Sequence, residues 1–315
     1  MKSVIYPKMP NMRHESILVI GGSGFIGSHI VAQLAATGRR VIVPTRRHHR
    51  ARHLTVLPTV QLIEADVYDP SALDRLMQHA DAVINLVGVL HSSGGTPWGP
   101  AFERAHVELP RRLVAACQRQ GLKRFLHMSA LGADEHGPSM YQRSKAAGEK
   151  IMVEARGLEL TSFRPSVVFG PEDNFLNMFA QLQSVLPVLA LGGVQTKFQP
   201  VFVGDVAQAF VQALENVDTI GQIYELVGPT IYSMKELLNL SGVYSGHPRP
   251  VIELPNALAR IQAFLLEHMP GGPIMSRDNL DSMKVDNVAT GLHSTPPAWQ
   301  ATPLEAVAPR YLAPH

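Results

Sequence analysis

Short, uniformly apolar runs alternate with segments of helical periodicity through the first half of the chain. Runs such as SILVIGG at 16–22 and DAVINLVG at 81–88 lack the polar alternation of a solvent-facing strand, so they indicate strands buried on both faces. The segment GFIGSHIVAQLAATG has apolar residues at helical spacing and ends at Gly38, a helix stop. Six apolar runs up to residue 170 predict an α/β fold, a Rossmann-type doubly wound parallel sheet.

Beyond residue 170 the alternation becomes irregular. The segments FVGDVAQAFVQALEN and YELVG still predict a helix capped by Asp205 and one more strand that returns to the sheet. The remainder is rich in proline and weakly periodic, so we expect a smaller irregular C-terminal substrate domain, the cap, over the carboxyl edge of the sheet. The predicted organisation is an N-terminal arm at 1–15, a Rossmann-type sheet domain at 16–170 joined by 199–228, and a cap at 171–198 and 229–315.

One segment of the cap, NALARIQAFLLEHMP at 256–270, has an amphipathic helical pattern that carries Arg260 and Glu267. The simpler interpretation is a helix whose apolar face packs on the core, and the alternative is a helix that lies on a membrane surface. No apolar stretch of about 18 residues predicts a spanning helix. We therefore expect a cytoplasmic protein, with peripheral contact on the cytoplasmic face of a membrane as the alternative.

Composition narrows the function classes. Hydrophobic residues make up 45% of the chain and charged residues 17%, as in a globular protein. The formal net charge of +2 gives no reason to expect a nucleic-acid partner. Cys117 is the single cysteine, so internal disulfides are excluded, and its helical context favours a buried, inert thiol in a reducing compartment. The first fifteen residues contain two prolines and no apolar run, so no signal peptide is expected.

A glycine motif lies directly after the first predicted strand and opens the first predicted helix. Gly21, Gly24 and Gly27 have the spacing G-x-x-G-x-x-G. In this context the first glycine permits a tight turn, the second lets backbone N–H groups approach a pyrophosphate, and the third allows close packing of helix on strand. The helix N-terminus then faces the anion with its positive dipole end. The motif predicts dinucleotide binding; the alternative is an unliganded glycine turn.

The end of the second strand selects the cofactor. An NAD site places an acid about 20 residues past the glycines, but here the chain reads PTRRHHRARH and has no acid before Glu64. Arginine forks suit the oxygens of a 2′-phosphate. We therefore predict NADP (NADPH/NADP⁺) over NAD, with Arg46 as the direct contact and Arg47 beside it, whereas Arg50 and Arg52 are solvated.

Other positions follow from the same sheet edge. Asp66, with Val67, follows the third strand and is placed to accept a hydrogen bond from the adenine amino group. The segment NLVG, with Leu86, Val87 and Gly88, ends the fourth strand under the adenine ribose. No metal site is expected, because nothing near His49 and His53, which have i,i+4 spacing, completes a ligand set.

The segment PSMYQRSKAAGEK at 138–150 carries the candidate chemistry. Tyr141 and Lys145 lie one helical turn apart, and Ser129 closes the fifth strand, so all three are expected at the carboxyl edge of the sheet. Hydride transfer between a carbonyl and its alcohol needs a proton partner at the oxygen, and a free phenol has a pKa of about 10. A nearby ammonium is expected to lower the pKa of Tyr141. The Ser129 hydroxyl orients the substrate oxygen, and Lys145 also holds the nicotinamide ribose.

The motifs GGSGFIG, HMSALGA, YQRSKAAGE and FRPSVVFGPED together resemble the extended branch of the short-chain dehydrogenase/reductase superfamily. The motifs FQPVFVGDVAQAF, YELVGP and SRDNLDSMKVDNV resemble its atypical subgroup, which includes the NADPH-binding accessory subunit of respiratory complex I and stand-alone bacterial relatives. The likeness runs from Ser16 to about Leu312. It implies a pyrophosphate loop of Gly21, Ser23, Gly24, Phe25 and Ile26, a 2′-phosphate contact at Arg46, a catalytic triad of Ser129, Tyr141 and Lys145, and a nicotinamide segment of Pro165, Ser166 and Val167.

One position departs from the pattern of that superfamily. His106 stands where the extended enzymes usually have an asparagine that supports the proton relay. Two hypotheses follow: an NADP-dependent oxidoreductase acting on a carbonyl, alcohol or apolar quinone-related substrate, or a non-catalytic NADPH-binding structural or assembly protein linked to respiratory or quinone machinery at a membrane. A third, by analogy alone, is a redox-sensing regulator.

Overall fold

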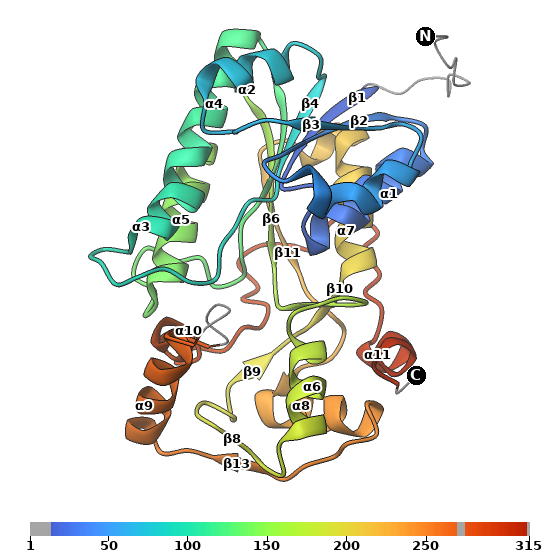
Figure 1. Cartoon of the computed structure of the whole chain (residues 1–315). Helices are drawn as coiled ribbons and strands as arrows, with labels where there is room; N and C mark the ends of the chain where they lie inside the picture. The colour runs from blue at the N-terminus through green and yellow to red at the C-terminus, as the bar shows by residue number, and fades with distance from the viewer. Residues whose placement is uncertain (1–13, 270–274, 314–315) are drawn as a thin grey trace.

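The computed structural model describes residues 14–269 and 275–313 (Figure 1). Most of the predicted arm, residues 1–13, lies outside the described residues. The first described strand begins at Ser16, where the sequence predicted it.

Seven strands form one sheet in the order β11-β6-β5-β4-β1-β2-β3, and every neighbouring pair is parallel. This arrangement confirms the predicted fold class. The strands are β1 (Ser16–Ile20), β2 (Arg40–Thr45), β3 (Val60–Glu64), β4 (Ala82–Asn85), β5 (Arg124–Met128), β6 (Glu159–Pro165) and β11 (Gln222–Leu226).

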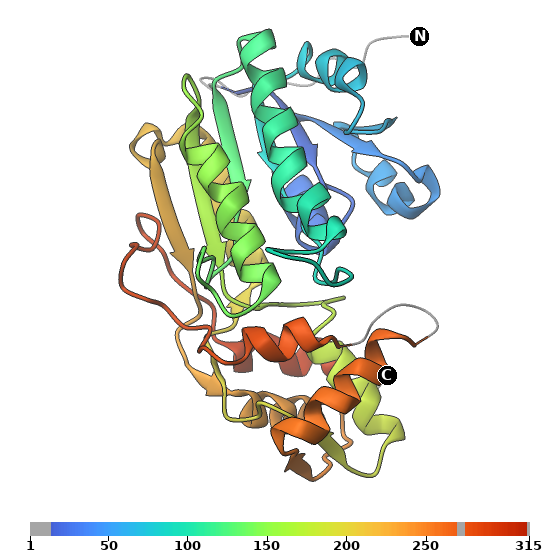
Figure 2. The ribbon, with the colours of Figure 1, turned by 90° about the vertical axis from the view of Figure 1, so that its left-hand side faces the viewer.

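Helices cover both faces of the sheet, with α1 and α7 on one face and α2, α4 and α5 on the other (Figures 1 and 2). Alternate residues of β1 belong to the two cores: Ile17 and Val19 to one, Leu18 and Ile20 to the other. Burial on both faces explains the uninterrupted apolar runs. The elements around the sheet are α1 (Phe25–Ala36), the 3-10 helix η1 (His48–Val56), α2 (Pro70–Met77), α3 (Pro100–Phe102), the π-helical segment η2 (Glu103–Glu108), α4 (Leu109–Gln120), α5 (Met140–Val153), α7 (Val203–Glu215) and the 3-10 helix η3 (Val217–Thr219).

The predicted helix at 101–120 contains the π-helical segment η2. Pro110 follows in the first turn of α4 and has no N–H to donate to the carbonyl of His106, so the regular ladder is interrupted there. On the other side, a Cβ at Gly148 of α5 would lie 1.9 Å from that same carbonyl oxygen, so α5 packs directly against the wider turn. The π-helical segment thus places His106 against the helix that carries Tyr141.

The prediction that Asp205 caps α7 was wrong. The helix begins at Val203, and its N-cap residue Phe202 makes no side-chain capping bond. Asp205 lies within the first turn, where its carboxylate accepts hydrogen bonds from the N–H (2.7 Å) and the hydroxyl (2.9 Å) of Thr302. The acid therefore ties the C-terminal part of the chain to the sheet layer.

The described part of the cap lies beyond the carboxyl ends of the strands (Figures 1 and 2). Its helices and short strands surround two small apolar clusters. Its elements, with the short pair β7–β10 at the junction, are β7 (Val168–Phe169), α6 (Leu176–Val185), β8 (Leu189–Leu191), β9 (Lys197–Phe198), β10 (Val201–Phe202), β12 (Tyr232–Ser233), α8 (Met234–Tyr244), β13 (Val251–Glu253), α9 (Asn256–Glu267), α10 (Arg277–Ser282) and α11 (Leu304–Leu312).

The helix α9 faces inward through its alanines and leaves most of its large apolar residues exposed, so the simpler interpretation holds only for the alanine face. Only Ala259 and Ala263 are buried. Four larger side chains are exposed to between 47% and 63%: Leu258, Ile261, Phe264 and Leu265. We call these four residues the α9 apolar face. Within the described residues no helix is long and apolar enough to cross a membrane.

Candidate functional site

The glycine turn between β1 and α1 has the predicted geometry. Gly21 has a φ of +84°, which L-residues rarely adopt. A Cβ at Gly27 would lie 2.3 Å from the Gly21 carbonyl oxygen, so only glycine lets the helix approach the turn this closely. Gly24 is the N-cap of α1. The N-terminus of α1 therefore has no side-chain cap and no acid in its first turn, which suits an anion.

The predicted cofactor-selecting arginines extend from the end of β2. Arg46 and Arg47 are exposed directly after Thr45, and the Thr45 hydroxyl accepts a hydrogen bond of 3.2 Å from the Arg47 N–H. Asp66 lies past the neighbouring strand β3, is exposed, and accepts a 3.0 Å bond from the Tyr68 N–H. The structure thus places the arginines and Asp66 at the ends of adjacent strands.

At the end of β4, the segment Leu86–Gly88 passes between the glycine turn and α5. The Leu86 N–H donates to the Ile20 carbonyl (2.9 Å), and the Val87 N–H donates to Asn85 Oδ1 (3.2 Å). A Cβ at Gly88 would lie 3.7 Å from His106 Nε2 and 4.0 Å from Lys145 Nζ. This segment therefore joins the predicted nucleotide loop to the predicted catalytic helix.

The helix α5 presents Tyr141 and Lys145 one turn apart. It starts with a capping box, in which Ser139 Oγ accepts from the Gln142 N–H (3.1 Å) and Gln142 Oε1 accepts from the Ser139 N–H (3.2 Å). Lys145 is 4% exposed, and its Nζ donates to the Met128 carbonyl at 2.8 Å. Burial lowers the pKa of Lys145 to about 8, against an opposing effect of Glu149.

The expected lowering of the Tyr141 pKa was wrong for this state of the protein. Burial raises the pKa of Tyr141 to about 12. The Lys145 ammonium does not offset this, because it is directed to the Met128 carbonyl. The phenol is therefore neutral near pH 7, a state that can donate a proton.

Ser129 directly follows β5, and its N–H donates to the Phe163 carbonyl at 2.7 Å. Its Oγ is buried and makes no hydrogen bond of good geometry to any described residue, with only a minor interaction with the Glu149 carboxylate. A buried hydroxyl without a proper partner is costly unless a ligand satisfies it. This hydroxyl is one residue from the carbonyl that holds Lys145.

His106 is a fixed, neutral residue. Its Nε2 accepts a 3.1 Å bond from the Val89 N–H, so the ring proton is on Nδ1 and is donated to Ser144 Oγ at 2.8 Å. The Ser144 hydroxyl donates onward to the Tyr141 carbonyl at 2.9 Å. The imidazole also contacts the Tyr141 ring edge-to-face, with centroids 5.6 Å apart. Burial, with smaller effects of Lys145 and His127, lowers the pKa of His106 to about 2.

Comparison with known proteins identifies the family. Residues 17–227 match the NAD dependent epimerase/dehydratase family. The chain belongs to that family. It is 32% identical over 273 residues to the NADH-ubiquinone oxidoreductase 40 kDa subunit of Neurospora crassa, a match covering 86% of this chain and 71% of that protein. This relative confirms the predicted resemblance to the accessory subunit of complex I.

A second relative in the family is an enzyme by name. The chain is 32% identical over 198 residues to the ceramide reductase of Caulobacter vibrioides, covering 62% of this chain and 59% of that protein. The fold is similar to UDP-glucose 4-epimerase of Thermus thermophilus in complex with NAD, with a TM-score of 0.63 and 24% identity over 85% of this chain and 99% of that one. UDP-glucuronic acid 4-epimerase of Bacillus cereus, with its sugar nucleotide and NAD, gives a TM-score of 0.68 and 19% identity over 94% and 98%. Likeness at this level shows a shared epimerase/dehydratase fold.

The residues present fit the dinucleotide of the epimerase/dehydratase family. The uncapped N-terminus of α1 suits a pyrophosphate, and a Cβ at Gly24 would meet only the Gly21 carbonyl, at 3.4 Å. Near the predicted catalytic helix, the buried Ser129 hydroxyl makes no hydrogen bond of good geometry to a described residue and suits a ligand oxygen. A groove of about 350 Å³ beside the edge strand β3, lined by Arg40, Gln61 and Arg75 among others, contains none of the predicted site residues. Among the described side chains, no cluster of three or more suits a metal ion.

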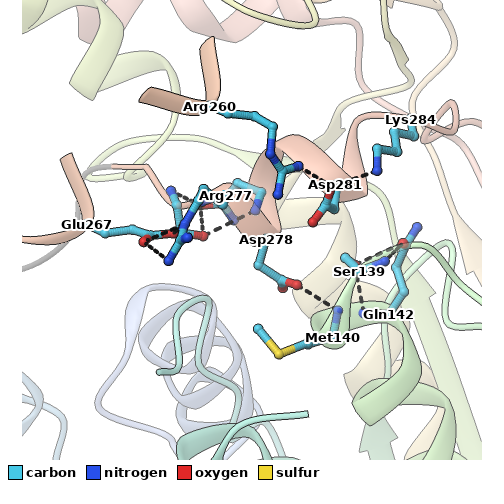
Figure 3. A network of polar contacts seen from close by, with 11 residues as sticks. Ser139, Met140, Gln142, Arg260, Glu267, Arg277, Asp278, Asp281 and Lys284 are labelled. Carbon is cyan, nitrogen blue, oxygen red and sulfur yellow. Dashed lines mark hydrogen bonds and ion pairs between the residues drawn. The ribbon is translucent and has the colours of Figure 1, made fainter. Parts of the chain in front are cut away.

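Two cap residues at the family's site were missed by sequence reasoning. Asn287 Oδ1 accepts from the Ser166 hydroxyl at 2.6 Å, and its amide donates to the Leu131 carbonyl at 3.1 Å. The hydroxyl of Ser166, predicted to flank the nicotinamide between Pro165 and Val167, is thus engaged by the cap. Asp278 accepts hydrogen bonds from the N–H groups of Met140 (Figure 3) and Tyr141, which start α5.

Proposed function

We propose that the protein is an NADP-dependent oxidoreductase that reduces an apolar or quinone-related carbonyl through Ser129, Tyr141 and Lys145. The observation that carries the proposal is the buried Ser129 hydroxyl, which makes no hydrogen bond of good geometry to a described residue. Ser129 directly follows Met128, whose carbonyl accepts the hydrogen bond from Lys145. A substrate oxygen bound there completes the hydrogen-bonding of Ser129 and lies beside a buried ammonium.

The protonation states suit proton donation during the reduction of a carbonyl. A phenol with a pKa near 12 keeps its proton at neutral pH, so Tyr141 is prepared to donate to a developing alkoxide. The pKa of Lys145, about 8, leaves it mostly protonated near pH 7, and its ammonium lies on the Met128 carbonyl directly before Ser129. Bound NADPH supplies the hydride for the carbonyl carbon, while Ser129 holds the oxygen.

The choice of NADP rests on Arg46 and Arg47, which extend from the end of β2 where an NAD site would have an acid. Arg46 is assigned the 2′-phosphate. An apolar carbonyl substrate is supported by the relative named ceramide reductase and by the apolar residues that the cap exposes at α9. The inferred reaction direction agrees with that relative's name.

The test has two steps. The first identifies the nucleotide that co-purifies with the protein and measures its exchange, by NADPH fluorescence, against excess NADP⁺ and then NAD⁺. Exchange within seconds supports a cycling cofactor, and NADPH oxidation is then measured with a panel of long-chain ketones and quinones. Retention of NADPH for hours, or selective displacement by NAD⁺, contradicts the proposal.

A second candidate function, favoured by the α9 apolar face, is a nucleotide-binding structural protein at a membrane or in a respiratory complex. Four large apolar side chains on one helix exceed the isolated exposed residues of ordinary surfaces. The relatives named as complex I subunits support this alternative. It predicts slow nucleotide exchange together with binding to lipid vesicles, whereas the oxidoreductase requires turnover.

A further inference from the structure

The start of α5 is closed by a residue from the cap. The capping box formed by Ser139 and Gln142 satisfies the third N–H of the helix but leaves the first two, those of Met140 and Tyr141. Asp278 of α10 accepts both: its Oδ1 accepts from Met140 at 2.6 Å (Figure 3), and its Oδ2 accepts from Tyr141 at 3.0 Å. A carboxylate that accepts from two adjacent N–H groups fixes the direction of the first helical turn. Its negative charge also balances the positive end of the helix dipole.

The carboxylate of Asp278 is itself immobilised. Asp278 is 6% exposed, and α10 has its own capping box between Ser276 and Asn279. Burial raises the pKa of Asp278, and the hydrogen bonds from Met140 and Tyr141 oppose that rise. These contacts hold the acceptor in the first turn of the short helix α10.

Ion pairs on both sides of Asp278 connect α10 to its surroundings in the cap (Figure 3). Arg277 pairs with Glu267 at the end of α9 at 3.0 Å. Asp281 pairs with Arg260 of α9 at 3.0 Å and with Lys284 at 2.7 Å. These pairs join α10 to α9, the helix that carries the α9 apolar face, whereas Asp278 itself contacts α5.

We propose that Asp278 is a positioning residue: through the first turn of α5 it sets the place of the Tyr141 side chain in the nucleotide and substrate site. The contact is local to the chemistry, because Tyr141 itself is the second N–H donor. The Tyr141 ring has two further neighbours, His106 and Phe102, with centroids at 5.6 and 6.1 Å. Asp278 is the polar contact from the cap that adds to this aromatic packing, and so it couples the cap to Tyr141.

This inference rests on the proposed function for its importance, but its test does not require turnover. The protein is prepared with ¹³C at the ζ carbon of tyrosine, and the Tyr141 signal is identified by its loss in Tyr141→Phe. The variants are Asp278→Ala and Asp278→Asn, the latter keeping the size of the side chain. The matched control is Asp281→Asn, which removes both ion pairs of that residue on the same helix and forms no hydrogen bond or ion pair with the described residues of α5.

We expect the Tyr141 signal to shift or broaden in both Asp278 variants and to stay unchanged in Asp281→Asn. We also expect NADPH release, followed by fluorescence after addition of excess NADP⁺, to be about tenfold faster in the Asp278 variants. An unchanged Tyr141 signal in Asp278→Asn, or an equal change in Asp281→Asn, overturns the inference. Failure of the wild-type protein to bind NADPH contradicts the proposed function alone, since the Tyr141 signal still reports on Asp278.

Discussion

Lys145 Nζ donates a hydrogen bond of 2.8 Å to the carbonyl oxygen of Met128, so the buried ammonium is held by the backbone one residue before Ser129. Burial keeps the pKa of Lys145 at about 8, below its ordinary value of 10.5. The unfolded chain therefore binds more protons than the folded protein between these two values, and stability rises with pH across that window. Below it, the folded protein carries the full cost of a buried charge.

We predict that Lys145→Met is more stable than the wild type near pH 7 and that this advantage shrinks toward pH 10. The difference in unfolding free energy between the two proteins should change by at most about 3 kcal/mol from pH 7 to pH 10, a limit set by the shift in the Lys145 pKa. Urea unfolding of both proteins at the two pH values measures it. Lys150→Met, an exposed position of the same helix, is the control and should show no pH-dependent difference. A constant difference between wild type and Lys145→Met would contradict the prediction.

Tyr141→Phe is predicted to lower the rate of NADPH oxidation about 100-fold or more, because a proton donor at the substrate oxygen is lost. NADPH affinity should change by only a few fold, since the ring keeps its contacts with His106 and Phe102. Steady-state rates and fluorescence titration separate the two effects. Tyr244→Phe, in the α8 helix of the cap, serves as the control. Turnover that survives in Tyr141→Phe would rule out the assigned proton donor.

Arg46→Ala is predicted to weaken NADPH binding by about ten- to a hundredfold and to leave NADH binding unchanged. A charge-assisted contact to the 2′-phosphate is worth about 1.5–3 kcal/mol, and NADH lacks that phosphate. Titrations of both nucleotides give the ratio. Arg52→Ala removes an exposed arginine of the same segment and should have little effect. Tighter binding of NADH than NADPH by the wild type would refute the assignment of Arg46.

The parallel sheet and the glycine turn were predictable because their physical causes are local in the sequence. Strands buried on both faces appear as continuous apolar runs, and β1 contributes alternate residues to two cores. Gly21 and Gly27 are required by the turn itself, through a positive φ and a close approach of backbone atoms. The family match confirms this part of the interpretation, whereas the roles of Ser129, Tyr141 and Lys145 stay predictions.

The contacts of the cap were not predictable, because they depend on distant parts of the chain. Asp278 lies 137 residues from Tyr141, and Asn287 lies 121 residues from Ser166. The S-x-x-N pattern at Ser276 indicates the start of a helix. It does not indicate to which other helix the carboxylate of Asp278 will bind. The periodicity of α9 likewise identifies an apolar face without fixing its direction. Here the alanine face packs inward, with Ala259 against Gly192.

His106 is predicted to make the protein sensitive to acid. Its pKa of about 2 in the folded protein lies below the ordinary 6.5, so its contribution to stability is complete above pH 6.5 and is lost as the pH falls. His106→Asn removes this group and should make the fall in unfolding free energy below pH 6 shallower by about 1.4 kcal/mol per pH unit. Urea unfolding from about pH 6 to 4 measures the slope. The exposed His136→Asn is the control, and parallel slopes for wild type and His106→Asn would contradict the prediction.

The α9 apolar face gives the last prediction, which separates the two candidate functions. Replacing Leu258, Ile261 and Leu265 by serine removes exposed apolar area without opening a cavity, so the variant should fold with a stability close to that of the wild type. If the face binds lipid, the wild type sediments with phosphatidylcholine vesicles and the triple variant stays in the supernatant. Leu292→Ser, at an exposed leucine outside α9, is the control and should sediment like the wild type. A wild type absent from the vesicle pellet at low salt would exclude lipid as the partner of this face, and unimpaired NADPH turnover in the triple variant would place the chemistry apart from it.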